Sequence, residues 1–273
     1  MKACIIQPPY SMDVSHSDEY FAFKMQMLDA CDETVDIIVL PEYSDVPCAT
    51  KGKEDTFYYH HKYINTLLDK CMETAKRCDA LVFVNALFQV GDNYRNTTYV
   101  YNRQGELVGQ YFKHHLPPLE KEVLELDYSY KEEVFKPYVL EIDGLRYGFL
   151  TCYDFYFYED FLEIARQNVD IIIGCSLQRS DTHDAIEIMC RFLAYNTNAH
   201  VIRSSVSFAE DSEICGASMV VSPFGKVLAN MKGRFGMEIV EFDPQDKYFK
   251  PAGFGNPPAA HHEYIEYGRG YQC

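Results

Sequence analysis

The chain has 273 residues, of which 41 are acidic and 25 basic, so its formal net charge is −16. Hydrophobic residues make up 47% and charged residues 24%, a balance that excludes a disordered or low-complexity chain and permits a large core. An acidic chain without a Lys/Arg-rich run repels phosphate groups. We therefore expect it to bind neither nucleic acid nor an anionic membrane.

The apolar runs and the cysteines indicate the cellular compartment in which we expect the protein. The apolar runs are far shorter than the ~20 residues of a membrane-spanning helix, and the start MKACIIQPPY lacks the apolar segment of a secretory signal. Ten cysteines occur without a CxxC spacing, which indicates reduced, mostly buried thiols in a cytoplasmic protein. The glycosylation sequon at residues 96–98 (NTT) then indicates little, since glycosylation requires export.

In the first half of the chain, short β-rich runs alternate with segments of helical period. The predicted strands are residues 3–7, 35–40, 80–90, 96–103 and 106–112, and the predicted helices are residues 16–32 and 58–78. Turn sequences at residues 91–93 (GDN) and 103–105 (RQG) separate the last three strands. A polar stretch from residue 113 to about 136 follows, and its length is typical of a functional loop.

The second half continues the alternation. The predicted strands are residues 137–143, 146–151, 169–174, 200–207, 218–222, 226–229 and 237–242, and the predicted helices are residues 157–167 and 183–198. From residue 251 the chain is rich in Pro, Gly and Tyr without a period, which indicates a tail. This order favours one layered α/β domain over residues 1–250, with parallel and hairpin strand pairs, and a C-terminal tail over 251–273.

Three polar residues follow predicted strands at their carboxyl ends, where α/β folds usually form a crevice. Glu42 could serve as a general base, because partial burial raises the pKa of a carboxyl group. Lys113 could stabilise a developing negative charge. Cys152 lies between a strand and a helical segment, a position that favours a thiolate and brings backbone N–H groups near an oxyanion. Taken singly, they also fit plainer roles as a solvated glutamate, a surface lysine and a buried cysteine.

Five segments, in the same order, resemble the signature blocks of the nitrilase superfamily, the carbon–nitrogen hydrolases. They are residues 40–42 (LPE), 111–116 (YFKHHL), 150–155 (LTCYDF), 191–196 (RFLAYN) and 216–227 (GASMVVSPFGKV). The resemblance extends over about residues 2–245. Any one block is common among proteins, but five in order are specific to this superfamily.

This resemblance implies a four-layer α-β-β-α sandwich and a thiol hydrolase that needs no metal or organic cofactor. It makes Cys152 the nucleophile, Glu42 the general base and Lys113 the stabiliser of the oxyanion, which the Tyr153 backbone N–H would also contact. It further implies a substrate-positioning glutamate in the loop after the lysine. Glu120 fits that role best, and two neighbours stay open as alternatives, namely Glu122 and Glu125.

Residues 153–154 (YD) are similar to the amidase and carbamoylase branches, whereas true nitrilases tend to carry Trp-Glu there. The hypothesis is therefore an amidohydrolase that cleaves a non-peptide C–N bond of a small amide or N-carbamoyl compound through a thioester and releases ammonia or an amine. Nitrile hydrolysis, acyl transfer and a non-catalytic scaffold are the alternatives. Residues 155–159, 174–177 and 191–196 depart from the family pattern, so the family's substrates do not carry over.

The resemblance also implies a homodimer or a higher homo-oligomer, in which the Tyr-rich tail could pack across the interface. Histidine pairs occur at residues 60–61, 114–115 and 261–262. Adjacent side chains point apart on a helix or strand, and no second ligand pair has finger-like spacing. We therefore expect no metal site.

Overall fold

The computed structural model describes residues 1–132, 138–253 and 255–270. Residues 133–137 of the predicted polar loop and following strand lie outside the described part, as do residue 254 and the last three residues of the predicted tail. No helix in these described ranges is both long and apolar enough to cross a membrane.

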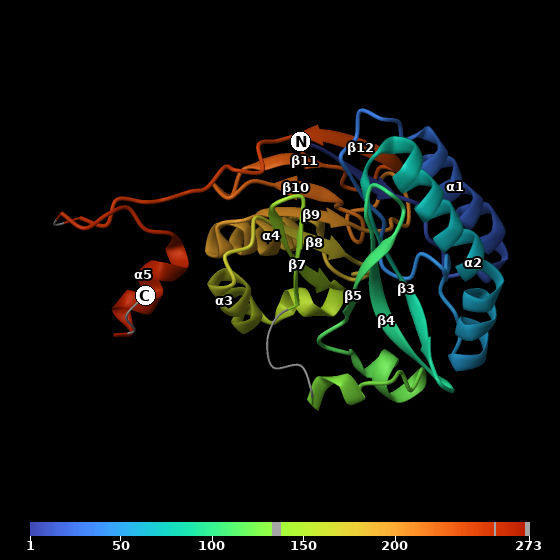
Figure 1. Ribbon diagram of the computed structural model, residues 1–273. Helices are drawn as coiled ribbons and strands as arrows, with labels where there is room; N and C mark the ends of the chain where they lie inside the picture. The colour runs from blue at the N-terminus through green and yellow to red at the C-terminus, as the bar shows by residue number, and fades with distance from the viewer. Residues whose placement is uncertain (133–137, 254, 271–273) are drawn as a thin grey trace.

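Two six-stranded sheets form the centre of the molecule (Figure 1). The first sheet has the strand order β12-β1-β2-β3-β4-β5. Its strands are β1 (Lys2–Gln7), β2 (Ile37–Val39), β3 (Leu81–Val90), β4 (Asn93–Tyr101), β5 (Leu107–Phe112) and β12 (Gly236–Glu241). The three strands β1, β2 and β3 are parallel, and the other neighbours pair antiparallel.

The second sheet has the order β11-β10-β9-β8-β7-β6. Its strands are β6 (Val139–Ile142), β7 (Leu145–Thr151), β8 (Ile171–Cys175), β9 (His200–Ser204), β10 (Met219–Val221) and β11 (Val227–Asn230). Here β7, β8 and β9 are parallel, and the register pairs Thr151 with Cys175. The segments that leave β7 and β8 therefore start side by side at one edge of the sheet.

Helices cover the outer face of each sheet (Figure 1). They are α1 (Ser17–Ala30) and α2 (Lys53–Cys78) on the first sheet, and α3 (Tyr158–Arg166) and α4 (His183–Thr197) on the second. One apolar cluster lies between the sheets and one lies under each helical pair. Ile37 and Val39 belong to the first of these clusters and Ile38 to the cluster under α1 and α2, so β2 is buried on both faces. The predicted α-β-β-α sandwich is confirmed.

The predicted elements are confirmed in type, with ends shifted by a few residues, but the loops hold more structure than expected. α2 begins at Lys53 rather than residue 58, because its first turn is acidic and precedes the apolar period. The polar loop contains a π-helical turn, Leu119–Val123, and a 3-10 turn, Ser129–Glu132. Neither turn is long enough to show a periodic apolar face.

The tail also differs from the prediction, since it contains a helix, α5 (His261–Gly268). Arg166 in α3 donates to both carboxylate oxygens of Glu266 at 2.9 Å, and the ring of His261 packs on Tyr195 in α4. A helix of eight residues is marginal by itself. Its contacts with α3 and α4 stabilise it, and those contacts are invisible in a local sequence pattern.

Candidate active site

The three polar residues predicted from strand ends meet at one cavity. Glu42 follows β2, Lys113 follows β5 directly, and Cys152 follows β7 directly. All three line a cavity of about 340 Å³, together with Glu120 from the π-helical turn. The two sheets thus contribute to the same site, Glu42 and Lys113 from the first and Cys152 from the second.

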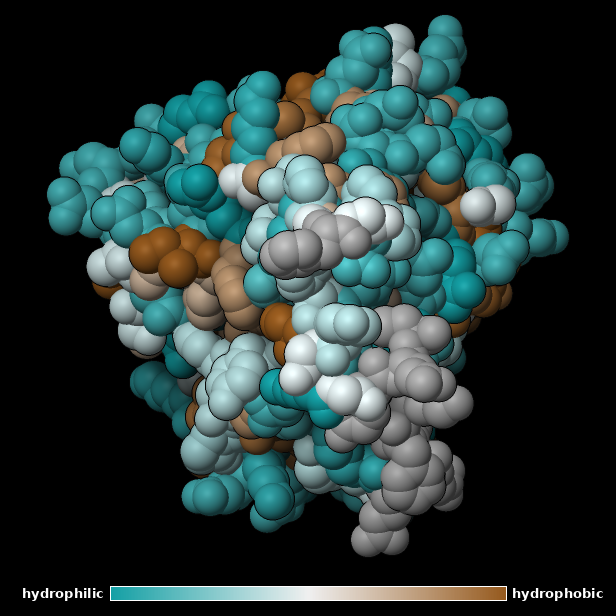
Figure 2. Space-filling model, turned by 90° about the vertical axis from the view of Figure 1, so that its left-hand side faces the viewer, coloured by the Kyte–Doolittle hydropathy of each residue, from teal (hydrophilic) through white to brown (hydrophobic). Residues whose placement is uncertain are grey.

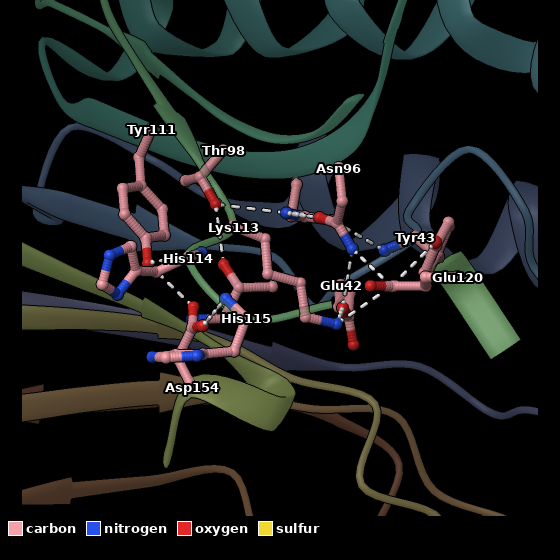
Figure 3. A network of polar contacts seen from close by, with 12 residues as sticks. Glu42, Tyr43, Asn96, Thr98, Tyr111, Lys113, His114, His115, Glu120 and Asp154 are labelled. Carbon is pink, nitrogen blue, oxygen red and sulfur yellow. Dashed lines mark hydrogen bonds and ion pairs between the residues drawn. The ribbon is translucent and has the colours of Figure 1, made fainter. Parts of the chain in front are cut away.

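A buried ionic cluster forms the polar part of the cavity (Figure 3). The Lys113 Nζ donates to Glu42 Oε1 at 2.7 Å and to Glu120 Oε1 at 2.9 Å. All three side chains are nearly inaccessible, with exposed fractions of 1% to 3%. Two carboxylates around one ammonium offset the desolvation free energy of the buried charges. An isolated ion buried at this position would instead lose its charge.

Asn96 joins this cluster, although the sequence analysis considered it only as part of a glycosylation sequon. Its Nδ2 donates at 2.8 Å to Oε1 of Glu42 and at 2.8 Å to Oε1 of Glu120. The Asn85 amide donates to Asn96 Oδ1 at 2.7 Å, which fixes the orientation of the Asn96 amide. The available signal was a pair of asparagines inside two long, otherwise buried strands, β3 and β4.

Of the three candidate glutamates in the loop, only Glu120 points into the cavity. The π-helical turn buries it, and Tyr43 donates its hydroxyl to Glu120 Oε1 at 2.8 Å. Among the described residues, Glu120 Oε2 is buried and has no hydrogen-bond partner. Glu122 is exposed, and Glu125 pairs with Lys53 at 2.6 Å on the surface. The sequence could not separate the three, because a π turn carries no periodic signal.

Cys152 opens a short 3-10 turn, Cys152–Tyr156, with a backbone φ of +49°. A left-handed conformation is uncommon for a residue with a side chain, and such strain concentrates at functional sites. Asp154 holds the turn, because its carboxylate accepts hydrogen bonds from the Thr151 and His115 backbone N–H groups at 2.8 and 2.7 Å. The Tyr111 hydroxyl donates to the same carboxylate at 2.8 Å.

Tyr153 follows the cysteine, and its ring packs edge-on against Tyr156 and Phe157. The side chain is not among the described residues that line the cavity. The predicted role of Tyr153 therefore rests on its backbone N–H.

The electrostatics of the site oppose a preformed thiolate. Burial, and then the Glu42 carboxylate, raise the pKa of the Cys152 thiol well above its usual range, and Lys113 offsets only part of this rise. The position at a strand-to-helix junction had favoured a thiolate, so burial reverses that expectation. Burial alone lowers the pKa of Lys113, but Glu120 and Glu42 outweigh it and the net pKa is raised. Burial also raises the pKa of Glu120, against the opposing effect of Lys113. The site therefore holds a thiol, a charged lysine and an adjacent carboxylate, that of Glu42.

The histidine pair 114–115 does not point apart as the sequence suggested. His114 Nδ1 and His115 Nε2 both approach Asp160 Oδ2, at 2.9 and 2.8 Å. The ligand atoms of these three residues lie within 4.8 Å of one another, the spacing of a group that could hold a metal ion. The three are not among the described residues lining the cavity, and their mutual hydrogen bonds account for the cluster.

The family model for carbon-nitrogen hydrolases matches residues 5–247. A 2-oxoglutaramate amidase of Bacillus subtilis is 28% identical over 160 residues, which cover 55% of this chain and 57% of that enzyme. A glutamine-dependent NAD(+) synthetase of Aquifex aeolicus is 25% identical over 215 residues, which cover 76% of this chain and 36% of that enzyme. The chain thus spans about half the length of this amidase and about a third of the length of this synthetase.

Solved structures of similar shape include an amidase of the nitrilase superfamily from Nesterenkonia AN1. One mutant form gives a TM-score of 0.69 at 17% identity and covers 90% of this chain and 91% of that one. Another form is described as carrying acrylamide added at its active-site cysteine, with a TM-score of 0.68 at 16% identity and 99% coverage of both chains. At this identity the likeness concerns the fold, and it confirms the predicted sandwich.

Proposed function

Because the chain belongs to the carbon–nitrogen hydrolase family, we propose that it hydrolyses the C–N bond of a small amide through a thioester on Cys152. The observation that carries this proposal is the buried cluster of Glu42, Lys113 and Glu120, which shares one cavity with the Cys152 thiol. The names of the similar proteins, two amidases and a glutamine-dependent synthetase, support an amide rather than a nitrile.

In the proposed acylation step, Glu42 takes the proton of the thiol while Cys152 Sγ attacks the amide carbonyl carbon. The base is needed because the thiol keeps its proton at neutral pH. The Lys113 ammonium and the Tyr153 backbone N–H stabilise the oxyanion. The C–N bond then breaks, Glu42 passes the proton to the leaving nitrogen, and ammonia or an amine departs from the thioester.

In deacylation, Glu42 takes a proton from a water molecule that attacks the thioester carbonyl carbon. The acid product leaves, and the thiolate of Cys152 takes back the proton. Glu120 has a separate role as a substrate-positioning residue. Its Oε2 is a buried acceptor without a partner among the described residues, and a substrate amide N–H would satisfy it.

The proposal predicts ammonia release that depends on Cys152. Wild type and Cys152→Ala are incubated with small primary amides, N-carbamoyl amino acids and nitriles, and ammonia is measured. We expect release by wild type only, and a residual rate at least ~10³-fold lower in the variant. Cys190→Ala, which removes a buried thiol in α4, is the matched control and should retain activity. Equal release by wild type and Cys152→Ala would contradict the role of the cysteine.

We further propose a homodimer formed through the face of α3 and α4. Three large apolar side chains on these helices are strongly exposed, namely Tyr158, Ile188 and Phe192. Figure 2 shows hydrophobic surface on the side of the molecule where α3, α4 and α5 lie.

We also propose residues 1–250 as the hydrolase domain with 251–273 as its appendage. The free thiols of all nine cysteines in the described ranges support a cytoplasmic location.

A further inference from the structure

One charged residue of the cavity has no part in the proposed chemistry. Arg179 lines the same cavity as Cys152 and lies in the segment that leaves β8, next to the edge where β7 ends. Its side chain is partly buried. The Leu177 backbone N–H is near enough to the Cys152 thiol to lower its pKa slightly, so this segment borders the nucleophile directly.

The segment around Arg179 is anchored on both sides. Gln178 is buried, and its Oε1 accepts a hydrogen bond from Arg203 Nη2 at 2.9 Å. The Gln178 Nε2 donates to Asp181 Oδ2 at 3.2 Å, and the Cys215 N–H donates to the Asp181 carbonyl at 3.0 Å. Because its neighbours are held, Arg179 lines the cavity from a fixed stretch of backbone.

The guanidinium of Arg179 forms no ion pair within residues 1–132, 138–253 and 255–270. Its hydrogen-bond contacts in that part of the chain are with uncharged groups, the Met12 Sδ at 4.0 Å and the Tyr10 hydroxyl. The carboxylate of Asp181, two residues away, is occupied by the Tyr156 hydroxyl and by Gln178. An arginine that faces a cavity without a counter-ion is a ready site for a carboxylate, which can accept two parallel hydrogen bonds from it.

The other charges of the cavity do not offer such a site. The Lys113 ammonium is already compensated by Glu42 and Glu120. The chain as a whole carries a net charge of −16, which repels an anionic substrate, so an anion needs a local cation to enter. The remaining lining is largely apolar and includes Leu119, Leu124 and Leu177, and a volume of about 340 Å³ suits a short ligand.

We propose that Arg179 binds a carboxylate of the substrate, so that the enzyme prefers short amides that also carry a carboxylate. This inference rests on the proposed amide hydrolysis and adds the class of substrate to it. Monoamides of short dicarboxylic acids and N-carbamoyl amino acids share this chemistry. In both, the amide carbonyl meets Cys152 while the acid end meets Arg179.

The test measures ammonia release from succinamate and from two neutral analogues, its methyl ester and butyramide. We expect wild type to have a kcat/KM for succinamate at least ~10-fold above the values for the neutral amides. Arg179→Met should raise the KM for succinamate by about 10- to 100-fold with a smaller change in kcat, and Arg179→Lys should keep part of the preference. Ammonia release from N-carbamoylglycine is measured separately. Its rate, compared with that of succinamate, shows whether the enzyme prefers N-carbamoyl amino acids or monoamides of dicarboxylic acids.

Arg234→Met is the matched control, because Arg234 is 60% exposed and pairs with Glu238 on the surface. It removes the same charge and should keep the preference for succinamate. Equal kcat/KM for charged and neutral amides in wild type would overturn the proposal while leaving amide hydrolysis intact. Equal losses on both kinds of amide in Arg179→Met would also overturn it.

A binding measurement separates the two proposals if no amide is hydrolysed. Succinate is titrated calorimetrically into Cys152→Ala and into Cys152→Ala with Arg179→Met. A dissociation constant at least ~10-fold weaker in the second protein supports the carboxylate site even if the proposed hydrolysis fails. Binding that is absent, or equal in both proteins, overturns the carboxylate site.

Discussion

Asn96 is the residue on which both carboxylates of the site converge. One buried Nδ2 group donates to Glu42 and to Glu120, and Asn85 holds the opposite end of the amide (Figure 3). Hydrogen bonds to charged groups contribute about 1.5–3 kcal/mol each, which is enough to decide the charge state of a buried carboxylate. Asn96 therefore positions the proposed base rather than touching the reacting atoms.

Asn96→Ala should lower kcat by about 10- to 100-fold with little change in KM. The lost donor disfavours the charged form of the carboxylates, so the acid limb of the kcat/KM profile should move to higher pH. The measurement is a pH–rate profile with circular dichroism as a check of folding. Asn93→Ala, at the exposed start of β4, is the control and should leave the profile in place. An unshifted acid limb in Asn96→Ala would contradict the positioning role.

At the scale of elements, the position of Cys152 depends on the packing of its 3-10 turn against β8. Phe155 of that turn is buried and lies over Gly174. A Cβ built on Gly174 would lie 2.7 Å from Phe155 Cζ, a distance that real Cβ atoms do not adopt. Gly174 therefore permits a close approach, and the turn that carries Cys152 rests on that contact.

Gly174→Ala should destabilise the fold by about 1–3 kcal/mol and reduce activity, because the displaced Phe155 ring moves the turn. Chemical denaturation and kcat measure the two effects. Gly148→Ala is the matched control on the adjacent strand β7, since its Cβ would meet no described atom closer than 3.4 Å. Phe155→Leu in the Gly174→Ala background should restore part of the activity. Additive losses in that double variant would argue against the contact.

At the scale of the whole molecule, the two helical layers differ in what they expose. Ile188 and Phe192 lie one turn apart on α4 and are 68% and 45% exposed. An exposed apolar patch of this kind on an otherwise acidic surface is typical of an interface. The tail helix α5 packs beside it, on α3 and α4.

We expect wild type in solution to have twice the 31.6 kDa mass of one chain. Phe192→Asp brings two like charges together across a two-fold axis and should shift the mass toward that of the monomer without loss of helical signal. Tyr58→Asp, at an exposed aromatic of α2, is the control and should stay dimeric. Light scattering coupled to gel filtration measures the molar mass of all three proteins. A monomeric wild type, or a dimeric Phe192→Asp, would refute this interface.

The amino-acid sequence alone determined the secondary-structure elements and the order in which the proposed catalytic residues follow one another along the chain. Period and turn residues give the strands and the long helices, because apolar spacing is a local property. The signature blocks around Glu42, Lys113 and Cys152 give the family, since each block is contiguous in the chain. The tail helix and the π turn escaped prediction, because contacts with distant residues, rather than local period, stabilise them.

Only the tertiary structure decided which polar groups meet. Asn96 of β4, Glu42 after β2 and Glu120 after β5 come from separate elements of the first sheet and meet where Glu42 and Glu120 line the cavity. The packed chain also distinguishes Glu120 from its neighbours, and it brings to the edge of the site Arg179, which forms no ion pair with any residue that the structure describes. Burial there reversed the thiolate expected at Cys152. Desolvation and long-range hydrogen bonds depend on the packed chain, so no local pattern could have supplied them.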